Sequence, residues 1–267
     1  MSAVSGKKKT PLGDRMENYS VVITSCGRFD LLRRTLESLV PNLDGPLEKI
    51  VIVEDSADHQ VKNVVAGLSG NYEILVNETK LGQIASIDRA YQTIKTPYIF
   101  HCEDDWEFFR GGFIHESAAL LALYPDVSMI GLRPRDDLNP LMRGAPTNIA
   151  NGIEFFFYDP TRHPEYFSYS FNPGLRRLSD YKQIGPYARL GYEPDISYAF
   201  KKAGFRMADL ENPAVRHIGW GRHIEDPYQP KRSKGLVQRL RKSVGKRVKR
   251  VARRTTQVFR NAESKGS

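Results

Sequence analysis

Short apolar runs alternate with amphipathic repeats along the first part of the chain. Four of these runs have the length and the β-branched or aromatic content of buried strands, and they cover residues 19–24, 49–53, 72–76 and 98–102. Apolar residues also recur every three or four positions over 29–40 and 84–94, which predicts two helices. Strands that alternate with helices form parallel sheets with right-handed crossovers. The pattern therefore predicts an α/β fold, a mostly parallel sheet flanked by helices.

The second part of the chain, residues 107–230, has a less regular pattern. The elements predicted here are two helices and a strand, at 112–123, 195–203 and 127–132. Gly204 directly follows the second helix, and glycine is the residue type that most often ends one. Two aromatic-rich stretches, 155–158 and 166–171, complete this region.

The composition is that of a globular protein, but the charge is divided unevenly. The chain has 267 residues, of which 40% are hydrophobic and 27% charged, and its net charge is +9. Residues 231–267 contain 14 Lys and Arg and one acid, so residues 1–230 carry four more acids than bases. The basic character therefore belongs to the tail and says little about the ligand of the globular part. The expected organisation is a disordered leader, a globular domain of two halves and a basic tail, at 1–18, 19–230 (19–106 and 107–230) and 231–267.

The basic tail has an amphipathic pattern. Residues 231–260 hold thirteen basic residues and no acid, and an apolar stripe runs through them from Leu236 to Val258. A basic amphipathic helix is typical of segments that bind anionic membrane surfaces; an RNA-binding or protein-binding arm, or a solvated tail without a partner, is the alternative. With two cysteines and no apolar run that could serve as a signal or a membrane span, we expect a cytoplasmic protein, peripheral at the inner face of the membrane. We expect no nucleic-acid partner, because the acidic globular part repels nucleic acid.

Polar side chains follow three of the predicted strands. Ligands of parallel sheets bind beyond the carboxyl ends of the strands, so residues that follow different strands meet in one crevice. The residues concerned are Thr24, Ser25 and Cys26 at the end of the first strand, Glu54 and Asp55 after the second, and Glu103, Asp104 and Asp105 after the fourth. A carboxylate of the middle group can accept hydrogen bonds from a ribose hydroxyl or a base N–H, or it can cap the next segment.

The three consecutive carboxylates at 103–105 are the strongest chemical signal in the sequence. At the end of a buried strand they lose hydration and repel one another. A divalent cation removes both penalties, and oxygen ligands suit Mg²⁺ or Mn²⁺, which also bind substrate phosphates. A solvated acidic turn is the alternative, and the apolar strand in front of the triplet favours the metal site.

These motifs, in this order, resemble those of the glycosyltransferases of family two, which bind nucleotide sugars with a GT-A fold. The segments that match are the opening strand with its nucleotide loop, the second strand with its acidic pair, the loop and helix before the metal motif, and the strand that ends in the DXD motif. In this chain they are 21–28, 50–56, 80–83 with 86–90, and 98–105. Glu103 and Asp105 take the outer positions of the DXD motif.

The resemblance implies a site, residue by residue. The implied nucleotide-binding residues are Thr24, Ser25, Cys26, Arg28, Glu54, Asp55, Gly82, Asp88 and Asp104. The implied metal ligands are Glu103, Asp105 and His217, the last preferred to His223, and the cofactor is Mn²⁺ or Mg²⁺. Arg222 could steady the diphosphate through its paired N–H donors.

The resemblance also implies a catalytic base at the start of the helix on the acceptor side. Glu193 lies at the usual position of the base and Asp195 follows two residues later. Asp195 is also explained as a helix-capping acid, so Glu193 is the preferred base. The implied reaction is a metal-dependent, inverting transfer of a sugar from a nucleotide diphosphate sugar to a glycan or lipid-linked acceptor, in surface glycan synthesis. The alternatives are nucleotidyl transfer, for which the loop after the first strand is a poor match, and nucleic-acid binding through the tail.

Overall fold

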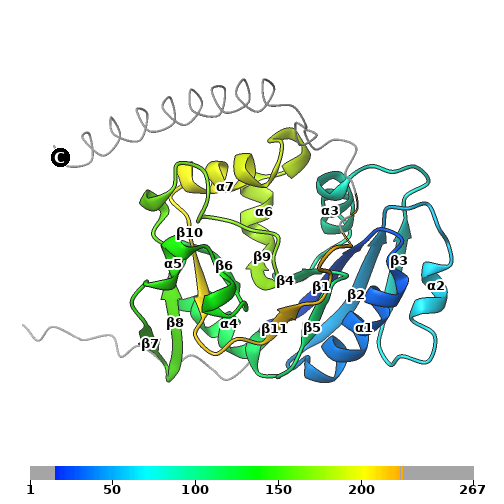
Figure 1. The fold of residues 1–267 in the computed structure, drawn as a ribbon, viewed down its shortest axis with the longest axis horizontal. Coiled ribbons are helices and arrows are strands. Elements are labelled where there is room, and N and C mark those ends of the chain that lie inside the picture. Colours follow the sequence, from blue (N-terminus) through cyan, green and yellow to red (C-terminus); the bar gives the residue numbers. More distant parts are fainter. Residues whose placement is uncertain (1–15, 223, 225–267) are drawn as a thin grey trace, which may run out of the picture.

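One nine-stranded sheet runs through the part of the chain that the structure describes. The computed structural model describes residues 16–222 and 224 (Figure 1). The strands of the sheet, in spatial order, are β3 (Tyr72–Val76), β2 (Leu47–Glu54), β1 (Tyr19–Ser25), β4 (Tyr98–Glu103), β9 (Gly174–Arg177), β6 (Val127–Gly131), β10 (Arg206–Leu210), β8 (Ile153–Phe157) and β7 (Asn148–Ala150). A separate two-stranded sheet consists of β5 (Trp106–Phe108) and β11 (Val215–His217).

Helices of very different lengths connect these strands. The α-helices are α1 (Phe29–Leu39), α2 (Val61–Val64), α3 (Gln83–Tyr91), α4 (Phe113–Leu123), α5 (Pro140–Arg143), α6 (Leu178–Ile184) and α7 (Glu193–Lys202). The 3₁₀ turns are η1 (Val40–Asn42), η2 (Arg135–Asp137), η3 (Pro160–Arg162) and η4 (Tyr187–Arg189). Gly204 follows α7 with a φ of +91°, as predicted for the residue that ends this helix.

The first half of the sheet is parallel, as the alternating pattern predicts. β1 pairs in parallel with β2 on one side and with β4 on the other, so that Val22 lies opposite Val51 and His101. The four predicted strands form, and the two predicted helices are α1 and α3. The predicted end of α3 is wrong by three residues, because Ile94 is buried beyond the last helical residue, Tyr91. Apolar periodicity marks buried positions and not the last backbone hydrogen bond.

The second half of the sheet mixes parallel and antiparallel pairs. β9 is antiparallel to both of its neighbours, β4 and β6, while β10 is parallel to β6 and antiparallel to β8. The sequence pattern does not predict β9, because this short strand contains two arginines. Arg176 is nevertheless buried, and its guanidinium donates to the Tyr169 hydroxyl at 2.8 Å and to the Ser170 carbonyl at 3.1 Å. The α/β class is confirmed, with a large central sheet flanked by helices.

Alternate residues of the central strands pack against helices on opposite faces of the sheet. Val21 shares a hydrophobic cluster with Leu36 of α1, whereas its neighbour Val22 packs with Ile87 of α3. This follows from the two-residue period of a strand. Figure 1 shows α1 and α3 on different sides of the parallel strands. The helices cover the two faces of the sheet, so the carboxyl ends of the strands stay available for a binding site.

The basic tail and most of the predicted leader lie outside the described residues. The predictions for 231–267, including membrane binding by 231–260, therefore stay predictions. Residues 16–18 form no helix or strand. Within the described part of the chain, every helix is too short or too polar to cross a membrane.

Candidate active site

A cavity of about 270 Å³ lies at the carboxyl ends of β1, β2 and β4. The predicted convergence of the strand ends is confirmed, since residues that follow all three strands line the cavity together with the loop before α3 and the segment after β11. The lining residues are Thr24, Ser25, Cys26, Arg28, Asp55, Lys80, Gly82, Gln83, Ser86, Glu103, Asp104, Asp105, His217, Gly219 and Ile224.

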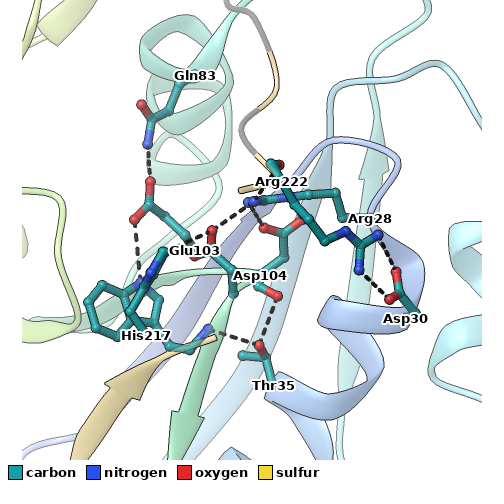
Figure 2. Close-up of polar contacts among 10 residues, drawn as sticks. Arg28, Asp30, Thr35, Gln83, Glu103, Asp104, His217 and Arg222 are labelled. Carbon is teal, nitrogen blue, oxygen red and sulfur yellow. Dashed lines mark hydrogen bonds and ion pairs between the residues drawn. The ribbon is translucent and has the colours of Figure 1, made fainter. Parts of the chain in front are cut away.

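Arg28 connects the loop after β1 to the acidic triplet (Figure 2). Its Nη1 lies 2.7 Å from Oδ2 of Asp105, and its Nη2 makes a shorter contact with Oδ1 of Asp104. Nη1 also donates to the backbone oxygen of Arg222 at 3.3 Å. Burial raises the pKa of Asp104 to about 6, even though the charge of Arg28 acts in the opposite direction. The guanidinium therefore neutralises part of the triplet.

The backbone of the triplet is fixed from α1. The hydroxyl of Thr35 donates to the carbonyl of Asp104 at 2.9 Å and accepts from the backbone N–H of Trp106 at 3.2 Å. Thr35 is fully buried on the inner face of α1 (Figure 2). A polar residue in the apolar stripe of this helix thus sets the position of the acidic residues.

The small sheet of β5 and β11 brings His217 to Asp105. His217 pairs with Trp106 across this sheet, and its Nε2 lies 3.3 Å from Oδ2 of Asp105. The backbone N–H of Ile218 donates to the Asp105 carbonyl at 2.9 Å. Burial would raise the pKa of Asp105, but the hydrogen bond with His217 and the charge of Arg28 outweigh burial and lower it. Asp105 is therefore ionised at neutral pH.

Asp105 and His217 fit the divalent cation that the acidic triplet predicts. Oδ1 of Asp105 is buried and has no hydrogen-bond partner among the described residues, which leaves it open to a ligand. Carboxylate and imidazole suit Mn²⁺, and Mg²⁺ or Mn²⁺ commonly takes its other ligands from water and substrate phosphates. Within 16–222 and 224, no three His, Cys, Asp or Glu side chains are grouped so that they could hold a metal ion by themselves. The protein would thus supply two ligands and leave the rest to the substrate and water.

Glu103, the third predicted metal ligand, is engaged by other neighbours. Gln83 donates to its Oε1 at 2.7 Å, and the Trp106 indole donates to its Oε2 at 3.4 Å (Figure 2). Burial and then the charge of Asp105 raise the pKa of Glu103 to about 7. Both of its oxygens accept hydrogen bonds, and among the described residues Glu103 is not grouped with Asp105 and His217 as a third ligand, so the geometry does not support Glu103 as a metal ligand.

Asp55 organises the loop on the other side of the cavity. Its Oδ1 accepts hydrogen bonds from the backbone N–H of Leu81 and the side-chain amide of Asn77, both at 2.7 Å, and its Oδ2 accepts from the N–H of Gly82 at 2.8 Å. Gly82 has a φ of +85°, a conformation that favours glycine. Asp55 therefore lines the cavity and also fixes the shape of the loop before α3, where the resemblance implies that the nucleotide binds.

Glu54, a predicted nucleotide-binding residue, does not line the cavity. It is fully buried at the end of β2, and its Oε1 accepts from the backbone N–H of Gly27 at 2.9 Å and of Ser56 at 2.8 Å. These bonds join the loop after β1 to the loop after β2. The structure places Glu54 as a loop anchor behind the site.

Asp88, a second predicted nucleotide-binding residue, also lies away from the cavity. Its carboxylate accepts from the backbone N–H groups of Tyr187 and Ala188 at 2.8 and 2.7 Å and from the hydroxyl of Tyr181 at 3.0 Å. It thus joins α3 to α6 and η4. Asp88, which the resemblance implies as a nucleotide-binding residue, thus connects the two halves of the domain.

Arg222 does not point into the cavity as a phosphate ligand. Its guanidinium pairs with the Asp30 carboxylate in the first turn of α1, and its side chain is 46% exposed (Figure 2). Only its backbone oxygen turns toward the site, where it accepts from Arg28. His223 lies outside the described residues.

Glu193 and Asp195 lie in the first turn of α7 and have different environments. Oδ2 of Asp195 accepts from the backbone N–H of Tyr192 at 3.4 Å, as a helix-capping residue does. Glu193 accepts hydrogen bonds from residues 170–171, and burial raises its pKa. Neither residue lines the cavity, but the charge of Glu193 raises the pKa of Glu103. Glu193 is therefore the acid of this turn whose charge acts on the triplet.

Five lining residues lie outside the predicted set. They are Lys80, Gln83, Ser86, Gly219 and Ile224. The first three stand in the loop and helix that the resemblance singles out, so that match contained the signal. Gly219 stands in the segment 216–223, which resembles the closing loop of the family and contains the predicted ligand His217. A Cβ at Gly219 would lie 2.5 Å from Oδ2 of Asp105, and only the folded chain shows this close approach.

The fold is that of GT-A glycosyltransferases. GalNAc-T7, in a crystal structure with UDP, GalNAc and Mn²⁺, has a TM-score of 0.56 and 15% identity over 81% of this chain and 46% of its own. The mannosyltransferase PcManGT from Pyrobaculum calidifontis, in complex with GDP-Man and Mn²⁺, has a TM-score of 0.55 and 12% identity over 80% of this chain and 61% of its own. S. aureus TarS has a TM-score of 0.52 and 15% identity over 74% of this chain and 59% of the crystallised chain. At such identities the likeness shows the fold, and the chain spans about half of the length of these proteins.

The sequence itself matches the family model of glycosyl transferase family 2 over residues 20–183. This match covers more than half of the chain, and the chain belongs to glycosyl transferase family 2. No curated protein matches the sequence. The family expected from the order of the motifs is confirmed, and so is the GT-A fold.

Proposed function

We propose that the chain transfers a sugar from a nucleotide diphosphate sugar to an acceptor hydroxyl, with a divalent cation and with inversion at the anomeric carbon. The observation that carries the proposal is the pair of Asp105 and His217 at the cavity, with one Asp105 oxygen that no described residue satisfies. Family membership favours sugar transfer over nucleotidyl transfer. The nucleotides and Mn²⁺ in two of the similar structures support a nucleoside diphosphate donor and a divalent cation.

Different residues of the cavity would bind different parts of the donor. A cation held by Asp105 and His217 would offset the charge that develops on the departing diphosphate. The loop at 24–26, together with Asp55 and Gly82, would bind the nucleoside through the hydroxyl, carboxylate and backbone groups that these residues bring to the cavity.

Glu193 is the base of the proposed reaction. A base should have a pKa near the working pH, and burial shifts the pKa of Glu193 upward in that direction. Hydrogen bonds from residues 170–171 hold its carboxylate, and the charge of Glu193 acts on Glu103 of the triplet. It would take the proton of the acceptor hydroxyl as that oxygen attacks the anomeric carbon on the face opposite the diphosphate, and one such displacement inverts the configuration.

The acceptor is a glycan or a lipid-linked saccharide in this proposal, and the product belongs to a surface glycan. The support is the composition of the tail, which lies outside the described residues. Residues 231–260 carry thirteen basic residues and no acid, and would hold the enzyme at an anionic membrane on its cytoplasmic face.

The proposal is tested by removing the carboxylate that it depends on. Asp105→Ala should abolish the Mn²⁺-dependent binding of UDP or GDP, because a lone imidazole is left to hold the cation, while the protein stays folded. Isothermal calorimetry of the nucleotide with and without Mn²⁺ gives the result, and circular dichroism checks the fold. Asp136→Ala, which removes an exposed carboxylate from η2, is the matched control. Equal nucleotide affinity in the two variants would contradict the assignment of the site.

A further inference from the structure

The guanidinium of Arg28 contacts two of the three consecutive carboxylates at once. Its Nη1 lies 2.7 Å from Oδ2 of Asp105, and its Nε lies 3.4 Å from Oδ2 of Asp104, in addition to the shorter contact of Nη2 with Asp104. The side chain of Arg28 is 14% exposed, and those of Asp104 and Asp105 are 1% and 9% exposed. Ion pairs with so little exposure are screened much less than surface pairs.

The oxygen that Arg28 holds is also the one that faces the imidazole. Nε2 of His217 lies 3.3 Å from Oδ2 of Asp105, the oxygen in contact with Nη1 of Arg28. A divalent cation bound by Asp105 and His217 would therefore share a carboxylate with a guanidinium. Two cations on one carboxylate repel each other, so Arg28 in this position opposes metal binding.

We propose that Arg28 is an internal counter-cation, which competes with the divalent cation for Asp105 and turns to the donor diphosphate when it is displaced. The inference rests on the proposed function of the site and adds to it how metal and donor are coupled. Arg28 has separate donors for the two carboxylates: Nε and Nη2 contact Asp104, and Nη1 contacts Asp105. It can therefore release Asp105, stay on Asp104 through Nε and Nη2, and offer the N–H groups of Nη1 to a diphosphate inside the cavity that it lines.

This competition makes the cation and the nucleoside diphosphate bind cooperatively. Without a nucleotide, the cation has to displace Nη1 of Arg28 from Asp105, and Nη1 gains no other anion in exchange. With a diphosphate present, the displaced Nη1 gains a partner and the displacement costs less. The coupling is reciprocal, so each ligand raises the affinity of the other by the same factor. A diphosphate also binds the cation directly, which by itself makes the two ligands bind cooperatively. The part of the cooperativity that is due to Arg28 is the part that is lost when Arg28 is replaced.

Binding of Mn²⁺ to the full chain, followed by the electron paramagnetic resonance signal of the free ion, tests the inference. In the absence of nucleotide, Arg28→Gln should bind Mn²⁺ about tenfold more tightly than the wild type. Arg28→Lys keeps the charge but cannot span two carboxylates with a planar fork, so its affinity should lie between the two. Arg34→Gln removes the same charge from an exposed position of α1 and should bind Mn²⁺ as the wild type does. UDP should raise the Mn²⁺ affinity by a smaller factor in Arg28→Gln than in Arg34→Gln.

Two results would overturn the inference. One is that Arg28→Gln binds Mn²⁺ no more tightly than Arg34→Gln does. The other is that UDP raises the Mn²⁺ affinity of both variants by the same factor. If circular dichroism shows that Arg28→Gln does not fold, Arg28→Lys decides by the same comparison.

A different result would overturn the proposed function. Absence of Mn²⁺ binding in the wild type, even with UDP or GDP, overturns the metal site and the inference together. Metal-dependent turnover of a nucleotide sugar by the wild type, combined with unchanged Mn²⁺ affinity in the Arg28 variants, overturns the inference alone.

Discussion

Three neighbouring carboxylates acquire three different acidities from their surroundings. Burial raises the pKa of Glu103 to about 7 and that of Asp104 to about 6. Burial acts in the same direction on Asp105, but the hydrogen bond with His217 and the charge of Arg28 lower its pKa below the ordinary value. The residue that remains fully ionised at neutral pH is the one best suited to a cation, and neighbours distant in the sequence decide which residue this is.

The same reasoning separates the two acids of α7. Glu193→Gln should keep donor binding and lower kcat about 10²-fold or more, because an amide cannot accept the acceptor proton. Burial raises the pKa of Glu193, so wild-type activity should fall as the pH drops below that raised value and the base becomes protonated. The measurements are kcat as a function of pH and calorimetry of the donor nucleotide.

Asp195→Asn is the matched control for this prediction. The capping bond to the Tyr192 N–H can persist with an amide oxygen, so this variant should keep most of its activity. An inactive Asp195→Asn beside a nearly wild-type Glu193→Gln would show that Asp195 is the base.

Asp209 gives a prediction about stability and pH. The side chain is 2% exposed at the end of β10, its Oδ2 accepts from the Tyr158 hydroxyl at 3.0 Å, and burial raises its pKa from 3.8 to about 7. Between these two values the folded state binds more protons than the unfolded state. The free energy of unfolding that this group contributes is therefore full below about pH 4 and is lost as the pH rises through 7. Asp209→Asn does not titrate, so relative to the wild type it should gain about 1–3 kcal/mol between pH 5 and pH 8.

Urea denaturation at the two pH values measures this gain. Asp136→Asn, at an exposed carboxylate of η2, should show no such change with pH. If the difference between Asp209→Asn and the wild type were the same at pH 5 and pH 8, the raised pKa of Asp209 would be refuted.

At the scale of elements, β9 joins the two parts of the sheet. It lies between β4 and β6 and is antiparallel to both, so its backbone has to approach two strands closely. A Cβ at Gly174 would meet the backbone oxygen of Ile130 and would lie 2.9 Å from the methyl group of Met129. The sheet therefore requires glycine at this position for lack of space, and not for backbone conformation.

Gly174→Ala should lower the free energy of unfolding by about 1–3 kcal/mol, since the backbone of a neighbouring strand cannot move aside cheaply. Urea denaturation measures the change. Gly144→Ala is the control, because a Cβ there meets nothing within 4 Å, and it should change the stability by no more than about 0.5 kcal/mol. Equal stabilities of the two variants would argue against the close packing of β9.

At the scale of the whole molecule, one sheet serves both halves of the domain. The cavity lies at the parallel strands of the first half, and the charge of Glu193 in α7 of the second half acts on its acidic triplet. Asp88 fastens the two halves by its bonds to Tyr187 and Ala188. The proposed donor and acceptor groups thus belong to one structural unit, to which the basic tail is attached.

The tail has a prediction of its own at this scale. Full-length protein should sediment with anionic liposomes, and a chain of residues 1–230 should not. Each basic residue near an anionic surface contributes about 1 kcal/mol, and salt screens this attraction, so binding should weaken steeply with salt and be poor on neutral liposomes. Equal sedimentation of the two proteins would refute membrane binding by 231–260, and stronger retention on RNA would assign the tail to nucleic acid.

The sequence by itself determined four strands and the helices α1 and α3 of the first half, the α/β class, and the meeting of three strand ends in one cavity. These features follow from local periodicity and from the geometry of parallel sheets, so a single chain suffices to predict them. The family also followed from the order of the motifs.

Only the tertiary structure decided what the polar residues of those motifs contact. β9 is a strand because of its neighbours, Asp88 and Glu54 hold backbone groups behind the cavity, and the Arg222 side chain pairs with Asp30. Arg28 and Asp105 are 77 positions apart in the sequence and share an ion pair. Local pattern carries no information about such partners, because a carboxylate at a strand end is equally suited to a ligand, a backbone N–H or a guanidinium until the fold brings one of them within reach.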